Sequence, residues 1–144
     1  MAKIHRSALV EYTAQQMFDL VNDIESYPQF MQGCVSAKVL EQDDKQLVGQ
    51  LRLKKAGISQ EFTTRNTMDY PRSIAMELVE GNFSNFNARW EFEPLSDAAC
   101  KVTLNMEFEF GGGLVDAALE KLFSSSANNL VDALVERAKL VYTQ

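Results

Sequence analysis

Apolar and polar residues alternate along the segment from Cys100 to Phe110. Every second residue is apolar, and the residues between them are polar or charged. Because successive side chains of a strand point to opposite faces of a sheet, this pattern predicts a strand with one buried face. The residues predicted to be buried are Cys100, Val102, Leu104, Met106, Phe108 and Phe110.

Five more strands are predicted between Gly33 and this segment, and another at Lys3–Val10. Turns containing Gly, Pro, Asn or Asp separate them at residues 42–45, 56–57, 70–73, 81–85 and 94–99. If Lys55 pairs with Ile58, neighbouring strands share one largely apolar face, which fixes the register. The predicted opposite pairs are Leu51 with Phe62, Leu53 with Gln60, Thr64 with Leu78, Asn66 with Met76, Met68 with Ile74, Phe92 with Val102, Trp90 with Leu104 and Val39 with Leu47.

The apolar residues after Gly113 follow a helical period instead. They recur at spacings of three and four, which predicts one continuous amphipathic helix over residues 114–141, packed across the apolar face of the sheet. Two short helices are predicted between the first and second strands. Thr13 and Gln16 form a capping-box pattern before a helix that ends near Asn22, and Ile24–Met31 contains Pro28. The helical apolar residues are Leu119, Phe123, Ala127, Leu130, Leu134, Ala138 and Val141.

These elements predict an α+β fold, a seven-stranded antiparallel sheet with one long C-terminal helix, in a single domain over residues 1–144. A chain of 144 residues that is 46% hydrophobic can bury one core. A net charge of −6 disfavours general binding to DNA or other nucleic acids. No apolar run reaches the roughly 20 residues of a membrane span and no secretory signal is recognised, so we expect a cytoplasmic protein without stable membrane insertion.

The sequence resembles the coenzyme-Q-binding, START-like family of the polyketide cyclase/dehydrase superfamily, and in particular its bacterial branch, the ribosome association toxins. The resemblance covers nearly the whole chain and implies a helix-grip fold, in which the curved sheet wraps around the C-terminal helix. It rests on the segments Arg6–Val10, Gln16–Val21, Tyr27–Phe30, Phe62–Asn66, Ala99–Val102, Phe108–Phe110 and Val131–Ala138.

The resemblance implies a tunnel between the sheet and the long helix, with a polyprenyl quinone such as ubiquinone, or a similar lipid, as its ligand. The first hypothesis is therefore that the protein binds this ligand without catalysing a reaction and so supports respiratory quinone function. It requires no other cofactor and implies transient contact with the inner membrane surface. Gln60, Thr64 and Asn66 share the inward face and could bind the quinone carbonyls. Hydrogen bonds to the backbone or to water could equally satisfy their polar groups. A filled core is the alternative to a tunnel. The predicted ligand-binding residues are Gln60, Phe62, Thr64, Asn66, Met76, Leu78, Trp90, Phe92, Leu104, Met106, Phe108, Phe123 and Leu130.

A second hypothesis is implied by the bacterial branch, namely binding to the large ribosomal subunit that blocks subunit association. Its candidate contacts are Arg52, Lys54 and Lys55, the densest basic cluster in the sequence. The alternative to a ribosome contact is that these residues form a solvent-exposed strand face, on which Arg52 pairs with Glu61.

A third hypothesis is a cyclase or dehydratase, because the same fold hosts such enzymes. It is disfavoured because His5 is the only histidine and is expected to face outward, so no catalytic residue and no metal site is predicted. Cys34 and Cys100 lie far apart and are expected to be buried apolar residues. Arg65 is expected to form a surface ion pair.

Overall fold

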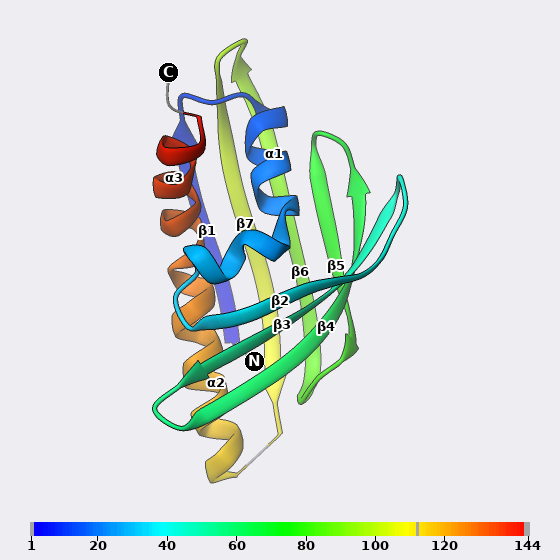
Figure 1. Ribbon diagram of the computed structural model, residues 1–144, viewed down its shortest axis with the longest axis vertical. Coiled ribbons are helices and arrows are strands. Elements are labelled where there is room, and N and C mark those ends of the chain that lie inside the picture. Colours follow the sequence, from blue (N-terminus) through cyan, green and yellow to red (C-terminus); the bar gives the residue numbers. More distant parts are fainter. Residues whose placement is uncertain (1, 112, 143–144) are drawn as a thin grey trace.

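The computed structural model describes residues 2–111 and 113–142, and Figure 1 shows their arrangement. Seven strands are followed by two helices at the C-terminal end, and two short helices separate the first two strands. The elements are β1 (Ala2–Val10), α1 (Ala14–Asn22), η1 (Ile24–Gln29), β2 (Cys34–Gln42), β3 (Gln46–Lys55), β4 (Ile58–Asp69), β5 (Ser73–Glu80), β6 (Phe83–Ser96), β7 (Ala99–Phe110), α2 (Leu114–Asn128) and α3 (Leu130–Val141).

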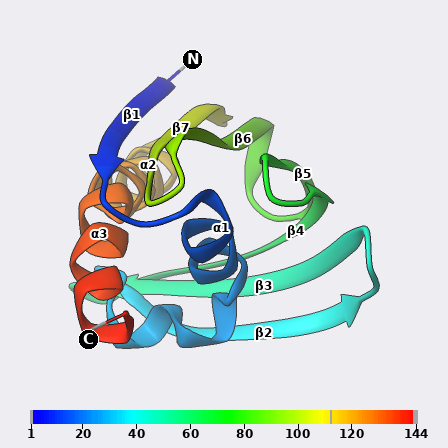
Figure 2. The ribbon, with the colours of Figure 1, turned by 90° about the horizontal axis from the view of Figure 1, so that it is seen from above.

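The seven strands form one antiparallel sheet in the order β1-β7-β6-β5-β4-β3-β2. Figure 2 shows that the sheet curls, so that α1 lies inside the curl, and α2 and α3 run past its open side between β1 and β3. An antiparallel sheet with one apolar face needs such a cover. The predicted α+β class and helix-grip architecture are therefore confirmed.

The predicted registers are confirmed for the pairs β3–β4, β4–β5 and β6–β7, including Leu51 opposite Phe62 and Trp90 opposite Leu104. The predicted pairing of Val39 with Leu47 is wrong. Val39 lies opposite Gly49, because Leu47 pairs with Gln42 next to the turn, and one register shift lies between Val39 and Glu41. The turns predicted at 81–85 and 94–99 are also too long, because β6 extends from Phe83 to Ser96.

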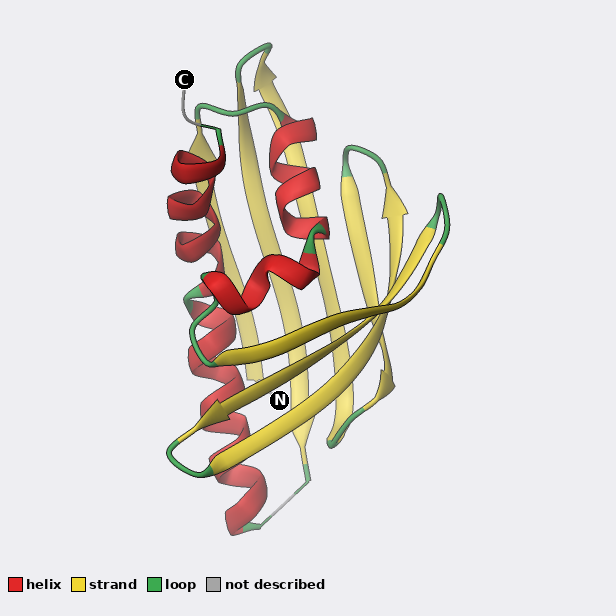
Figure 3. Cartoon of the chain, in the orientation of Figure 1, coloured by secondary structure: helices red, strands yellow, loops and turns green. Residues whose placement is uncertain are grey.

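The predicted single C-terminal helix is interrupted at Asn129, so the prediction of one continuous helix is wrong. Asn129 has φ −93° and ψ −5°, and its side-chain amide donates a hydrogen bond of 2.8 Å to the carbonyl of Ser125. Such a side-chain bond to the backbone competes with regular helix geometry. Figure 3 shows the two helices joined end to end along one side of the sheet.

The predicted capping box of α1 is confirmed. The Gln16 amide N–H donates to Thr13 Oγ1 at 3.1 Å, and the Thr13 N–H donates to Gln16 Oε1 at 2.8 Å. These two bonds satisfy N–H groups that would otherwise lack partners at the start of the helix. The second short helix is a 3₁₀ helix that ends at Gln29, two residues before the predicted boundary at Met31.

The core lies between the concave face of the sheet and the helices. Trp90 and Phe108 are 3% and 0% exposed, which confirms the predicted inward face. Phe123 of α2 sits at the centre of an aromatic cluster, with its ring centroid 4.8 Å from that of Phe108. Val141 is an exception to the predicted helix face, because it is 47% exposed at the end of α3. The other rings near Phe123 belong to Phe62, Phe83, Phe86 and Phe110.

Candidate ligand cavity and basic hairpin

A mostly apolar cavity of about 50 Å³ lies inside the grip. Strands β3 to β7 form its floor, α1 and η1 close one side, and the junction of α2 and α3 closes another. Its lining contains no Asp, Glu, His, Lys, Arg or Cys. The lining residues are Val21, Asn22, Ile24, Tyr27, Met31, Gly49, Leu51, Phe62, Thr64, Asn66, Ile74, Met76, Phe86, Trp90, Met106, Phe123, Ala127 and Leu130.

The predicted ligand-binding residues divide into two groups. Those on the cavity wall are Phe62, Thr64, Asn66, Met76, Trp90, Met106, Phe123 and Leu130. The others, Gln60, Leu78, Phe92, Leu104 and Phe108, do not line it. Phe92, Leu104 and Phe108 are 0–2% exposed, so their side chains are taken up by packing in the core. Ligand contact by any of these residues stays a prediction.

Cavity residues from α1 and η1 were not predicted from the sequence. Tyr27 and Met31 lie in the predicted second short helix, but periodicity does not say against which strands a short helix packs. Gly49 is a sequence signal for the close packing of η1 against β3. A Cβ on Gly49 would lie 2.3 Å from Cδ1 of Ile24, so the glycine allows η1 to pack closely onto β3.

Polar groups occupy two places on the cavity wall. Thr64 Oγ1 donates a hydrogen bond to Asn66 Oδ1 at 2.8 Å. The two residues predicted to bind a quinone head group are thus already hydrogen-bonded to each other. Asn22 Oδ1 is buried and has no hydrogen-bond partner among the described residues. Because an unpaired buried acceptor is costly, Asn22 is the polar cavity atom best placed to bind a donor from a guest molecule.

Gln60 differs from the other polar residues of β4. It is 4% exposed, and neither its side-chain oxygen nor its nitrogen has a hydrogen-bond partner within the described part of the chain. It lies on the inner face between Ile58 and Phe62, outside the cavity wall. The cavity therefore does not border Gln60, the residue predicted to contact a quinone head group.

The size of the cavity limits what it can hold. A cavity of 50 Å³ has room for only a few waters, since each needs roughly 10–15 Å³. Pockets for drug-sized ligands usually measure about 300 Å³ or more. A quinone ring with its tail therefore fits only if side chains or a helix move outward.

The buried cysteines are unreactive in this setting. Burial raises the pKa of the Cys34 thiol and of the Cys100 thiol to about 11, so both stay protonated near neutral pH. His5 is exposed and hydrogen-bonds to Asn105. In residues 2–111 and 113–142, no group of three or more His, Cys, Asp or Glu residues is arranged to hold a metal ion.

The basic hairpin between β3 and β4 is only partly free. Arg52 Nε lies 3.7 Å from Glu61 Oε2, as expected for cross-strand neighbours of opposite charge. Lys54 and Lys55 are exposed, and neither forms an ion pair with another described residue. The hairpin therefore offers the two lysines, rather than all three predicted residues, to an anionic partner.

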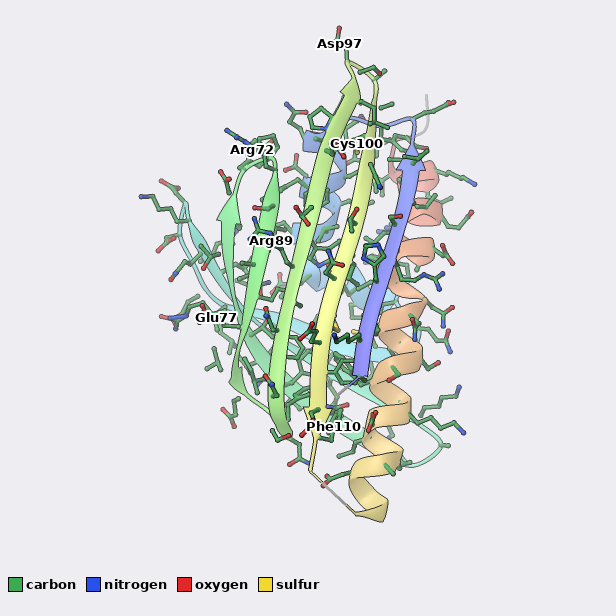
Figure 4. All side chains as sticks on the ribbon, turned by 180° about the vertical axis from the view of Figure 1, so that it is seen from behind. Arg72, Glu77, Arg89, Asp97, Cys100 and Phe110 are labelled. Atoms are coloured by element: carbon green, nitrogen blue, oxygen red, sulfur yellow. The ribbon has the colours of Figure 1, made fainter. Side chains whose placement is uncertain are left out.

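Arg65 does not form the predicted surface ion pair with any described residue. Its Nε is buried without a hydrogen-bond partner, although Glu77 is its cross-strand neighbour in β5. Figure 4 shows Glu77, Arg72 and Arg89 on the convex side of the sheet, away from the cavity. Arg89 there donates to Ser73 Oγ at 3.2 Å. Arg89 is thus engaged locally, whereas Arg65 Nε has no partner among the described residues.

The curved sheet closed around a C-terminal helix and an internal apolar cavity define a START-like helix-grip protein. Residues 10–135 match the family described as polyketide cyclase / dehydrase and lipid transport, and the chain belongs to this family. It is similar in structure to a START superfamily protein from Mycobacterium smegmatis, with a TM-score of 0.78, 20% identity and coverage of 96% of this chain and 98% of that one.

Two relatives resemble the whole chain in sequence. The ribosome association toxin RatA of Vibrio cholerae serotype O1 is 46% identical over 142 residues, which cover 99% of each chain. The mitochondrial coenzyme Q-binding protein coq10 of Schizosaccharomyces pombe is 25% identical over 141 residues, covering 93% of this chain and 85% of the relative. No helix in the described ranges is long and apolar enough to cross a membrane.

Proposed function

We propose that this protein is a non-enzymatic binding protein that associates with the large ribosomal subunit through the β3–β4 hairpin and thereby blocks subunit association. The observation that carries the proposal is the pair of exposed lysines at the hairpin tip, Lys54 and Lys55, which form no ion pair with other described residues. The 46% identity over 99% of the chain to a ribosome association toxin supports it. The cavity lining, which has no Asp, Glu, His, Lys, Arg or Cys, agrees with a binding role.

The charge distribution explains how an acidic chain could bind ribosomal RNA. With a net charge of −6, the molecule as a whole is repelled by phosphate groups. Two exposed cations lie next to each other in sequence at the end of the hairpin, whose tight turn limits the conformational freedom that binding would cost. Binding by such a patch depends steeply on salt, because each phosphate contact releases a counterion.

The double variant Lys54→Glu/Lys55→Glu is expected to lose at least about tenfold in affinity for large subunits, because two attractions become repulsions. Co-sedimentation with purified subunits at about 50 and about 200 mM salt measures this loss. The matched control is Lys38→Glu/Lys45→Glu, with two exposed lysines at other positions and the same change in charge. Equal binding of the double variant and the wild type, or binding that ignores salt, would contradict the proposal.

A second candidate function is the binding of a hydrophobic ligand such as ubiquinone or a similar lipid. The observation in its favour is the apolar cavity with the unpaired Asn22 Oδ1 on its wall. The whole-length similarity to a coenzyme Q-binding protein supports it at lower identity. Because the cavity measures about 50 Å³, the ligand would have to widen the grip on entry.

The substitution Met76→Trp tests this second function, because the larger ring would occupy the cavity on which Met76 borders. Protein isolated from its own host should carry a stoichiometric quinone or lipid in native mass spectrometry, and the variant should lose that ligand while remaining folded. Overpacking of a filled core would instead lower stability by about 1–3 kcal/mol. Full ligand retention with strong destabilisation, or wild-type protein without lipid, would rule this function out for the cavity.

A further inference from the structure

A groove of about 330 Å³ runs between the β3–β4 hairpin and α2, and it shares no residue with the inner cavity. One wall is the hairpin end, where Lys55 and Ile58 are cross-strand partners. The other wall is a stripe on α2 whose members recur at spacings of three and four and so share one helix face. The groove residues on α2 are Ala118, Lys121, Leu122 and Ser125.

The two walls are held in fixed positions. Ala56 and Gly57 both have positive φ, 52° and 82°, which gives the tight two-residue turn of a β-hairpin. Leu122 is buried, and Ser125 accepts a 3.4 Å hydrogen bond from Gln32 Nε2, which ties this part of α2 to the segment before β2. The shape of the groove is therefore largely formed before anything binds.

The groove combines an apolar floor with two cations and no anion. Ile58, Ala118 and Leu122 supply the floor, and the ammonium groups of Lys55 and Lys121 flank it. Both lysines are exposed, and the described residues give neither an ion pair. In a chain with a net charge of −6, this local arrangement favours a partner with apolar and acidic groups side by side.

We propose that this groove binds a short acidic and apolar peptide segment of a protein partner, with one apolar side chain on the floor and carboxylates at Lys55 and Lys121. The lining has no aromatic or Arg side chain on which a base could stack, so single-stranded RNA is a poorer match. A long lipid chain also fits less well, because the next inward residue of β4 after Ile58 is Gln60, whose buried polar amide is a poor neighbour for an apolar tail.

The proposal can be tested by selecting random peptides displayed on phage against the intact protein. The enriched peptides should pair at least two acidic residues with Leu, Ile or Phe. Synthetic copies should bind at least about tenfold more weakly to Lys121→Glu and to Ala118→Glu, because each variant places a negative charge in the groove. The matched controls are Lys45→Glu, a lysine at the other end of β3, and Ala133→Glu on α3, and both should bind like the wild type.

Absence of enriched peptides, or peptides that bind the groove variants as well as the wild type, would overturn the proposal. Enrichment of basic peptides would overturn it too. Circular dichroism on Ala118→Glu and Lys121→Glu separates lost binding from lost folding, since both positions are partly or fully exposed. The groove variants change Ala118 and Lys121 and leave Lys54 and Lys55 intact, so peptide binding can be lost while ribosome binding is retained.

Discussion

Replacing Phe123 by alanine is expected to lower the free energy of unfolding by about 3–5 kcal/mol, the range for buried Phe-to-Ala changes. Phe123 is 2% exposed, and its ring centroid lies 4.8, 5.0 and 5.4 Å from those of Phe108, Phe83 and Phe62. The substitution would remove the ring through which α2 contacts aromatic rings of the three strands β4, β6 and β7. Urea denaturation of the variant and the wild type measures the change.

The control for this substitution is Leu9→Ala, which truncates a side chain that is 73% exposed and should change stability by no more than about 0.5 kcal/mol. A loss below about 2 kcal/mol for Phe123→Ala would mean that α2 collapses into the vacated space. That outcome would contradict the tightly packed aromatic cluster and favour an interior that can change its volume.

Replacing Gln60 by methionine is expected to stabilise the protein by about 1–3 kcal/mol, the cost of a buried polar group without a partner. Gln60 is 4% exposed, and both polar atoms of its amide lack a partner among the described residues. Methionine has a similar length and adapts to irregular space, so it fills the same position without that cost. The midpoint of chemical denaturation should rise.

The matched control is Gln42→Met, which changes an exposed glutamine at the end of β2 and should leave stability nearly unchanged. A lower midpoint for Gln60→Met would show that the amide binds something in solution, such as an ordered water or a copurified ligand. Native mass spectrometry of the wild type would then distinguish these two partners.

The sheet was largely predictable because short turns fix the register of the strands that they join. The Ala56-Gly57 turn sets the whole β3–β4 ladder, and the pairing of Lys55 with Ile58 follows from it. The β2–β3 pairing was mispredicted because Leu47 pairs with Gln42 at the turn, and apolar alternation does not show at which residues a turn closes. The register shift between Val39 and Glu41 is likewise decided by local backbone geometry.

The break in the C-terminal helix was not predictable from apolar spacing. Ala127, Leu130 and Leu134 keep the spacing of three and four across the junction, so the periodicity continues where the helix does not. The break coincides with a hydrogen bond from the Asn129 side chain to the Ser125 carbonyl. Asparagine can make that bond or leave it unmade in the same sequence.

The candidate sites were predictable only where they lie on one strand face. Trp90 and Met106 were placed inward by alternation, whereas the contributions of Asn22 and Ile24 depend on how α1 and η1 pack on the sheet. Lys121 joins Lys55 only after α2 crosses the hairpin. Periodicity also cannot separate a packed interior from a hollow one, because both need the same apolar residues.

The junction at Asn129 divides the C-terminal helical segment into α2 and α3, and different hydrogen bonds connect these two helices to the rest of the protein. Among the described residues, side-chain bonds connect α3 and its C-cap to other elements, namely Arg6 to Asp132 at 3.2 Å, Arg137 to Gln29 at 2.8 Å and Tyr142 to the Gln16 carbonyl at 2.7 Å. The bonds from α2 are longer, at 3.3 Å to Asn82 and 3.4 Å to Gln32.

Helix α2 is also a shared wall, because Phe123 and Ala127 border the cavity while Ala118 and Lys121 border the groove. A guest that widens the cavity by displacing α2 necessarily changes the distance between Lys121 and Lys55. If both proposed sites bind their ligands, they would be coupled through this one helix, and each ligand would alter the affinity of the other by the same factor.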